Sequence, residues 1–169
     1  MIELKEQDMN PKLELNSAIR STQNWDTYYL GMAKYVASKS KDPSTKTGAV
    51  IVRPDWTQCS IGFNGFPRKM PDDDSLYANR ESKYSRIVHC EINAQILSRD
   101  ASLEGYTLYT WPFASCDRCC VQMIQAGITR FVAPTLPEDK KERWQSSLEL
   151  TRKYIEECGL TLDLIDMIE

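Results

Sequence analysis

Residues 87–97, IVHCEINAQIL, and residues 115–126, SCDRCCVQMIQA, decide the fold class of this 169-residue chain. In the first stretch, the apolar residues after the chain's single histidine, His89, share one helical face, which predicts a helix that begins beside the histidine. The second stretch predicts another helix, which begins at a Cys-x-x-Cys pair and ends at Gly127. Both helices therefore begin at residues that commonly bind metals.

Apolar patterns elsewhere predict helices that alternate with strands, which indicates a layered α/β domain. We expect the first two strands to form a hairpin. The last two strands should run parallel, because a helix of roughly 20 residues separates them. Residues 64–86, with two prolines and three successive aspartates, predict a long loop of the length that is usually functional. The other predicted helices span residues 24–39 and 138–158, and the predicted strands span residues 47–52, 58–63, 107–111, 128–133 and 160–165.

Length and composition favour one domain over residues 24–169, preceded by an N-terminal arm over residues 1–23. The net charge is -3, and the lysines and arginines form no basic stripe, which argues against a polynucleotide partner. No apolar run approaches the roughly 20 residues that span a bilayer, so we expect no membrane partner. With no leader-like segment, the six cysteines are expected to be reduced thiols in the cytoplasm.

The histidine and the cysteine pair predict a catalytic zinc site. His89, Cys116 and Cys119 supply three ligands, which leaves a tetrahedral zinc ion one open position for water. Glu91, two residues after His89, is then placed to move the proton of that water to a ring nitrogen and to a leaving amine. The expected products are a carbonyl compound and ammonia.

Each of these residues also has an ordinary structural interpretation. A lone histidine can belong to the core, a Cys-x-x-Cys pair can be half of a structural zinc site or a redox pair, and a glutamate at a helix start can be a cap. A structural zinc site needs four protein ligands, however. The evident fourth ligand is Cys120, which is adjacent to Cys119 and badly placed to share its metal. The combination therefore favours catalysis.

Six segments carry a resemblance to known proteins: SKDP (40–43), GAV (48–50), GFNGFP (62–67), KY (83–84), VHCEINA (88–94) and IQAGI (124–128). In order and spacing, over roughly residues 24–133, they resemble the deoxycytidylate (dCMP) deaminase family. A His-x-Glu motif followed by Cys-x-x-Cys is the signature of zinc-dependent nucleobase deaminases in general. The resemblance implies a cytidine deaminase-like α/β/α sandwich of three layers around a five-stranded mixed sheet.

The resemblance also implies a reaction, the hydrolysis of dCMP to dUMP, and a role for each matching residue. Zinc would bind His89, Cys116 and Cys119, and Glu91 would be the proton shuttle. The implied substrate contacts are Asn64 to the sugar hydroxyl, the backbone of Ala49 to the base, and Ser40, Lys41 and Tyr84 near the phosphate.

Many members of the family are hexamers that dCTP activates and dTTP inhibits, so the resemblance implies a homo-oligomer with nucleotide effectors and Mg²⁺. Because the chain has no second histidine, we expect one zinc ion per subunit. Ser115 departs from the family, which has proline directly before the first cysteine. We expect this change to reshape the base pocket, while Ser115 caps the following helix.

Two other functions stay open from the sequence. One is a deaminase of a modified cytosine nucleotide or of another aminated base, which the altered segment before Cys116 would permit. The other is a zinc or nucleotide-binding protein without catalytic activity, against which Glu91 argues. A polynucleotide deaminase is disfavoured by the acidic balance of charge.

Overall fold

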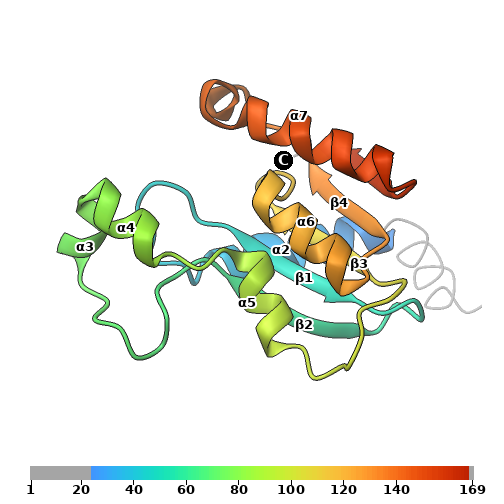
Figure 1. Ribbon diagram of the computed structural model, residues 1–169, viewed down its shortest axis with the longest axis horizontal. Helices are drawn as coiled ribbons and strands as arrows, with labels where there is room; N and C mark the ends of the chain where they lie inside the picture. The colour runs from blue at the N-terminus through green and yellow to red at the C-terminus, as the bar shows by residue number, and fades with distance from the viewer. Residues whose placement is uncertain (1–23, 168–169) are drawn as a thin grey trace, which may run out of the picture.

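The computed structural model describes residues 24–167, which contain a mixed five-stranded sheet with the strand order β2-β1-β3-β4-β5 (Figure 1). Strand β1 pairs antiparallel with β2 and with β3, whereas β3, β4 and β5 run parallel. These pairings confirm the predicted hairpin and the parallel final strands. The strands are β1 (Gly48–Val52), β2 (Gln58–Phe63), β3 (Thr107–Trp111), β4 (Arg130–Pro134) and β5 (Thr161–Ile165).

Helices cover both faces of the sheet and so complete the predicted three layers (Figure 1). Because side chains alternate along a strand, Val50 and Val52 of β1 join one buried cluster with α2, and Ala49 and Ile51 join another with α5, α6 and α7. The helices of these layers are α2 (Trp25–Ala37), α5 (Cys90–Leu97), α6 (Asp117–Ala126) and α7 (Lys141–Glu157), which follows a 3₁₀ turn, η1 (Glu138–Lys140).

Helices α5 and α6 both begin at residues of the predicted metal site. His89 is the N-cap of α5 and Cys116 is the N-cap of α6, each with an extended backbone. The free N–H groups and the partial positive charge of a helix N-terminus favour a thiolate over a thiol. The motif residues thus stand where the backbone helps cysteine to bind a metal.

Gly62 fixes α5 closely on the sheet. A Cβ atom at this position would lie 2.3 Å from the backbone N of Ala94 and 2.4 Å from the carbonyl O of Cys90. Real Cβ atoms do not approach backbone so closely, so the contact between β2 and α5 requires glycine. Since His89 and Glu91 stand at the start of α5, this contact also fixes their height above the sheet.

The prediction of a loop over residues 64–86 is wrong in part, because this segment contains two short helices. The Asn79 side chain caps the second helix by accepting a 2.8 Å hydrogen bond from the backbone N of Ser82. The Tyr77 ring stacks on Phe66 with 4.2 Å between centroids. Helices this short have no periodic apolar pattern to detect. They are α3 (Asp74–Ala78) and α4 (Arg80–Arg86).

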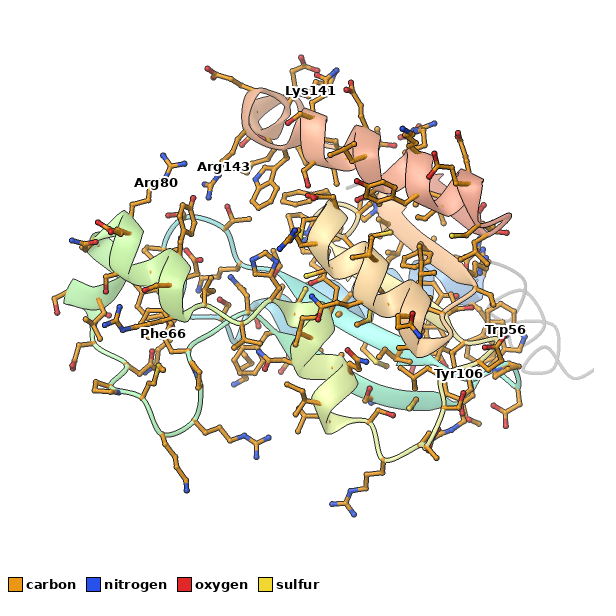
Figure 2. The ribbon with its side chains drawn as sticks, in the orientation of Figure 1. Trp56, Phe66, Arg80, Tyr106, Lys141 and Arg143 are labelled. Carbon is orange, nitrogen blue, oxygen red and sulfur yellow. The ribbon has the colours of Figure 1, made fainter. Side chains whose placement is uncertain are left out.

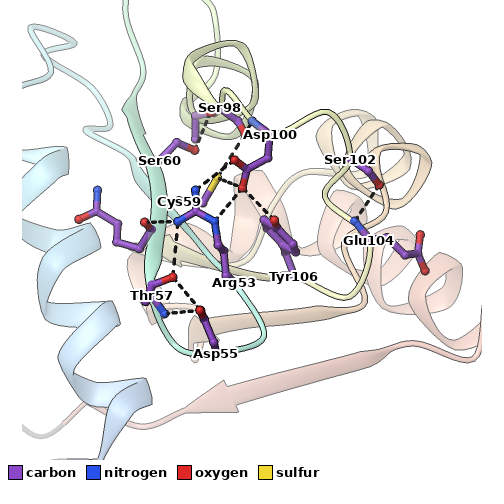
Figure 3. A network of polar contacts seen from close by, with 12 residues as sticks. Arg53, Asp55, Thr57, Cys59, Ser60, Ser98, Asp100, Ser102, Glu104 and Tyr106 are labelled. Carbon is purple, nitrogen blue, oxygen red and sulfur yellow. Dashed lines mark hydrogen bonds and ion pairs between the residues drawn. The ribbon is translucent and has the colours of Figure 1, made fainter.

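A polar network joins the β1-β2 turn to the segment between α5 and β3 (Figure 3). Arg53 pairs with Asp100 through two N–H groups, at 2.8 and 3.1 Å, and the Tyr106 hydroxyl donates to the same carboxylate at 2.8 Å. The bonds from Arg53, and next those from Tyr106, lower the pKa of Asp100 to about 2. The network therefore holds Asp100 ionised through most of the acid range.

The predicted N-terminal arm, residues 1–23, lies outside the described residues. The domain boundary at residue 24 accordingly stays a prediction. Within residues 24–167, none of the helices has the length and apolar character to cross a bilayer.

Candidate active site

Three metal-binding side chains come together from the starts of α5 and α6. The Nδ1 atom of His89 lies 3.5 Å from the Sγ of Cys116 and 3.4 Å from the Sγ of Cys119. All three donor atoms lie within 4.8 Å of one another, and both cysteines are buried. The structure therefore brings together the three residues that the sequence predicted as ligands.

The spacing of these donors fits a tetrahedral zinc ion. Zn–S bonds of about 2.3 Å and Zn–N bonds of about 2.0 Å would separate neighbouring nitrogen and sulfur ligands by about 3.5 Å. The alternative fourth ligand, Cys120, is fully buried, and its Sγ faces the carbonyl of Thr151 at 3.9 Å. The donor set thus fits an open site with three protein ligands better than a closed structural site.

The two cysteines share one proton unequally. The Cys119 thiol, and then the His89 ring, lower the pKa of Cys116 to about 5. The same contact raises the pKa of Cys119, because its proton is held against the Cys116 sulfur. A metal ion that binds both sulfurs would release this proton.

Glu91 lies beside the three donors in the first turn of α5 and is 4% exposed. It lines the same cleft as His89 and Cys116. The Sγ of Cys90 donates to its Oε2 at 3.1 Å. Burial, and then the charge of Glu91, raise the pKa of Cys90 well above its ordinary value, so Cys90 stays a neutral donor. Sequence reasoning missed this contact between Cys90 and Glu91.

A cleft of about 540 Å³, counting the part open to solvent, extends from the donors towards α4 and α7. Its lining combines the acid and metal donors with aromatic rings and one arginine, a combination that suits a planar, anionic ligand. The residues concerned are His89, Glu91, Cys116, Tyr84, Trp111, Phe113, Trp144 and Arg143.

A buried ion pair joins α4 to the segment before β1 on the wall of this cleft. The Nζ of Lys83 lies 2.7 Å from Oδ1 of Asp42, and the two side chains are only 7% and 4% exposed. Asp42 also accepts a 2.8 Å bond from the backbone N of Ser44. Removing either charge would leave the other buried and unpaired, so the pair is an integral part of the wall.

Asn64 lines the cleft, and its side chain already binds the protein. Its Oδ1 accepts from the backbone N of Thr47 at 2.8 Å, and its Nδ2 donates to the carbonyl of Thr45 at 2.9 Å. One lone pair of Oδ1 is left for a ligand hydroxyl. Ser40 is buried, and its hydroxyl donates to the backbone carbonyl of Asn64 at 2.9 Å. Ser40 itself is not one of the described residues that line the cleft.

The other predicted substrate residues are divided between the cleft and its surroundings. Tyr84 lines the cleft and is 45% exposed. Lys41 is on the surface, paired with Asp72 at 2.7 Å. Ala49 is fully buried in β1, opposite Gly62. Two of the five predicted contacts, Asn64 and Tyr84, therefore lie in the cleft.

Comparison with known proteins identifies the family. The family model of the cytidine and deoxycytidylate deaminase zinc-binding region matches residues 23–135, which include all three donors and Glu91. The chain belongs to this family. Its match ends before α7, so the family model covers the metal centre but only part of the cleft.

Several relatives of this deaminase carry names from the same family. The uncharacterized deaminase of the luxG 3′ region of Aliivibrio fischeri is 35% identical, over 80% of this chain and 90% of the relative. The probable deoxycytidylate deaminase of Drosophila melanogaster is 30% identical, over 96% of this chain and 90% of the Drosophila protein. For mouse deoxycytidylate deaminase the identity is 33%, over 64% and 63% of the two chains.

Solved structures support the fold of the deaminase. The apo dCMP deaminase of cyanophage S-TIM5 superposes with a TM-score of 0.63 at 18% identity and covers 83% of this chain and 96% of the phage chain. The same phage enzyme in complex with dCMP and dUMP gives a TM-score of 0.62 at 17% identity, over 93% and 99% of the chains. The predicted cytidine deaminase-like sandwich is thereby confirmed.

Two cleft residues, Arg143 and Trp144, were missed as site residues. Both come from the first turn of α7, beyond the part of the chain that the family model matches. Trp144 does fall on the apolar face of the predicted helix, but that pattern cannot distinguish core from cleft. For Arg143 no local signal exists, because a single arginine at a helix start resembles a solvated charge.

The expectation that Ser115 caps α6 is wrong. Its Oγ is buried without a hydrogen-bond partner among the described residues. The first turn is instead capped by Ser147 of α7, whose Oγ accepts from the backbone N of Asp117 at 3.1 Å and donates to its Oδ1 at 2.6 Å. Ser115 is turned into the protein, where its carbonyl accepts from Thr151 at 2.8 Å. Helix α7 thus holds the start of the metal-binding helix.

Proposed function

We propose that this deaminase hydrolyses dCMP to dUMP and ammonia. The observation that carries the proposal is the position of Glu91, a buried acid that lines one cleft together with the three-donor centre. Relatives named deoxycytidylate deaminase support the choice of base and sugar. The metal ligands in this proposal are His89, Cys116 and Cys119, with one zinc ion per subunit.

The reaction adds water across the N3=C4 double bond of the base, with the oxygen on C4, and then breaks the C4–N4 bond. Zinc bound by these three residues supplies Lewis-acid activation of water at neutral pH. Glu91 accepts the proton of the attacking water and passes it to N3 of the ring. It then moves the remaining hydroxyl proton to the amino group, which leaves as ammonia while C4 becomes a carbonyl. Cys90 orients the carboxylate by donating to Oε2.

The proposed substrate contacts have unequal support. Asn64 has a free lone pair in the cleft and takes the sugar hydroxyl, and Ser40 holds its backbone in place. Tyr84, which lines the cleft, would lie near the phosphate. The backbone of Ala49, which is fully buried, would contact the base. Lys41 would contact the phosphate, and for this it would have to break its ion pair with Asp72.

A second candidate is a deaminase of a modified cytosine nucleotide. The specific observation in its favour is the wall formed by Trp111, Phe113 and Ala114, in the segment that departs from the family before Cys116. A substituent on the base would meet this wall. A protein without catalytic activity is disfavoured, because it would have no use for a buried Glu91 beside the donors.

We also propose a cytoplasmic homo-oligomer, a hexamer by family resemblance, with dCTP and dTTP as effectors and Mg²⁺ as their counter-ion. Exposed apolar side chains on α5 and α6 support self-association: Ile96 is 69% exposed, Leu97 46% and Val121 45%. All six cysteines are free thiols, which agrees with a reducing compartment. Light scattering with and without each nucleotide tests the assembly and its effectors.

Loss of ultraviolet absorbance on incubation with a panel of nucleotides tests the proposed substrate. Zinc-loaded protein should turn over dCMP in preference to CMP, dCTP and dAMP. Preferred turnover of a 5-substituted dCMP would establish the second candidate. Absence of turnover with every substrate, even with dCTP and Mg²⁺ present, would contradict both.

A further inference from the structure

Arg143 occupies an unusual place for an exposed arginine, because aromatic rings flank it and no acid within residues 24–167 forms an ion pair with it. Its guanidinium carbon lies 5.1 Å from the centroid of the Trp144 ring and 5.8 Å from that of Tyr84. An Nη2 hydrogen bond to the Tyr84 hydroxyl joins α7 to α4 across the cleft. Within residues 24–167, none of the ion pairs includes Arg143.

A second arginine approaches the same tyrosine from the other helix. Arg80 and Tyr84 are four residues apart on α4, and the guanidinium of Arg80 lies 5.2 Å from the Tyr84 ring centroid. Figure 2 shows Arg80 extending from α4 towards α7, and Arg143 extending from α7 towards α4. Arg80 likewise takes part in none of the ion pairs among the described residues. Two guanidinium groups without an ion-pair partner among the described residues therefore lie beside the ring of Tyr84, a residue of the cleft lining.

A hydrogen-bond donor without an acceptor lies next to Arg143. The Nε1 of Trp144 is buried and has no hydrogen-bond partner among the described residues, although Trp144 lines the cleft. Its ring packs on Phe113 at 5.0 Å between centroids, which holds the indole in place. Buried N–H groups normally have an acceptor, so this one is expected to meet an oxygen of a bound ligand.

Neither Lys41, which was predicted to lie near the phosphate, nor Lys83 of the cleft wall can bind a phosphate without rearrangement. Lys41 is paired with Asp72, and Lys83 is paired with Asp42. Arg143, by contrast, is both unpaired and part of the cleft lining. Guanidinium groups bind phosphate oxygens in pairs of parallel bonds, and the rings beside Arg143 preorganise it for such contacts.

We propose that Arg143 and Arg80 bind the 5′-phosphate of the substrate, with Tyr84 as the residue that positions Arg143. This inference rests on the proposed function, since it assigns the phosphate requirement of that same site. Helix α7, which the family model does not cover, would then determine that the deaminase acts on a nucleotide and not on a nucleoside.

The test compares dCMP with deoxycytidine as substrates of the zinc-loaded protein. R143Q should lower kcat/KM for dCMP by roughly 10- to 100-fold, the effect of losing charge-assisted hydrogen bonds, and leave kcat/KM for deoxycytidine unchanged. Y84F should lower the dCMP value less and also spare deoxycytidine, which a purely structural defect would not do. R152Q, the same change on the exposed side of α7, is the matched control and should alter neither value.

Calorimetric binding of dUMP and deoxyuridine gives a second readout that needs no turnover. R143Q should weaken dUMP binding by at least about 10-fold and leave deoxyuridine binding as in the wild type. Equal losses for both ligands, or an unchanged preference for the phosphorylated one, would overturn the assignment of Arg143. Failure of the wild-type protein to deaminate dCMP would instead overturn the proposed function, and the phosphate assignment with it.

Discussion

Glu91 is the residue on which the proposed chemistry depends, since it is the acid buried beside the metal donors. E91Q keeps the shape of the side chain and removes its ability to accept a proton. We expect kcat for dCMP to fall by about 10²- to 10⁴-fold, the usual contribution of general acid–base catalysis. Zinc content measured by plasma mass spectrometry should stay at one ion per chain, because Glu91 is not a ligand. Loss of zinc in E91Q would show that this role is misassigned.

The sequence was sufficient to predict individual residues only where chemistry restricts the residue type. His89, Cys116 and Cys119 could be predicted because few other roles explain that set at that spacing. Arg143 could not, because it enters the cleft only when α7 returns over the start of α6, a long-range contact that no local pattern encodes. Ser115 was misplaced for the same reason, since its helix is capped by Ser147 of α7.

The close packing of helix α5 on the sheet depends on Gly62. G62A would place a Cβ atom within 2.4 Å of backbone atoms of α5. Backbone atoms cannot move aside as the end of a flexible side chain can. We expect the free energy of unfolding to fall by about 3 kcal/mol or more, which is at the upper end of the usual cost of overpacking a core. We also expect weaker zinc binding. Urea unfolding measures the first effect and metal competition the second.

Gly31 provides the matched control for this substitution. It stands inside α2, and nothing lies within 4 Å of the position that a Cβ atom would take there. G31A should therefore stabilise the protein by about 0.5–1 kcal/mol through reduced backbone entropy of the unfolded chain. Equal destabilisation by both substitutions would show that the close contact at Gly62 is not what matters.

The network around Asp100 should make the free energy of unfolding depend on pH in the acid range. Arg53 depresses the pKa of this carboxyl to about 2 in the folded protein, against 3.8 as the ordinary value. A depressed pKa adds stability above pH 3.8 that is lost as the pH falls through about 2. D100N should therefore be less stable than wild type at pH 7, and the difference should shrink between about pH 4 and about pH 2. A difference that does not depend on pH would contradict the ionic account.

Elements with a clear apolar period could be predicted closely, and those without one could not. Helix α7 and strand β4 differ by at most three residues at either end from their predicted ranges of 138–158 and 128–133. Helices α3 and α4 are held by a cap and by one aromatic stack, so the prediction of a loop failed there. Short helices that depend on such contacts give little signal in composition.

The whole molecule combines the metal centre, which lies within the family model, with a cleft that α7 completes beyond it. The family match ends at residue 135, while α7 contributes Arg143 and Trp144 to the cleft and caps the metal-binding helix through Ser147. This division explains why the reaction type could be predicted from the sequence alone. It also explains why the cleft residues of α7 could not, since their position depends on how a later element packs over the motif.

Product analysis in ¹⁸O-labelled water tests the central proposal most directly. Zinc-loaded protein incubated with dCMP should form dUMP and ammonia in equal amounts, with one ¹⁸O atom in the base at C4, because the oxygen comes from water and the amino group leaves. Mass spectrometry of the nucleotide and an ammonia assay give both amounts from one sample, and E91Q should form both products about 10²- to 10⁴-fold more slowly. Unlabelled dUMP, or no dUMP at all, would contradict the account.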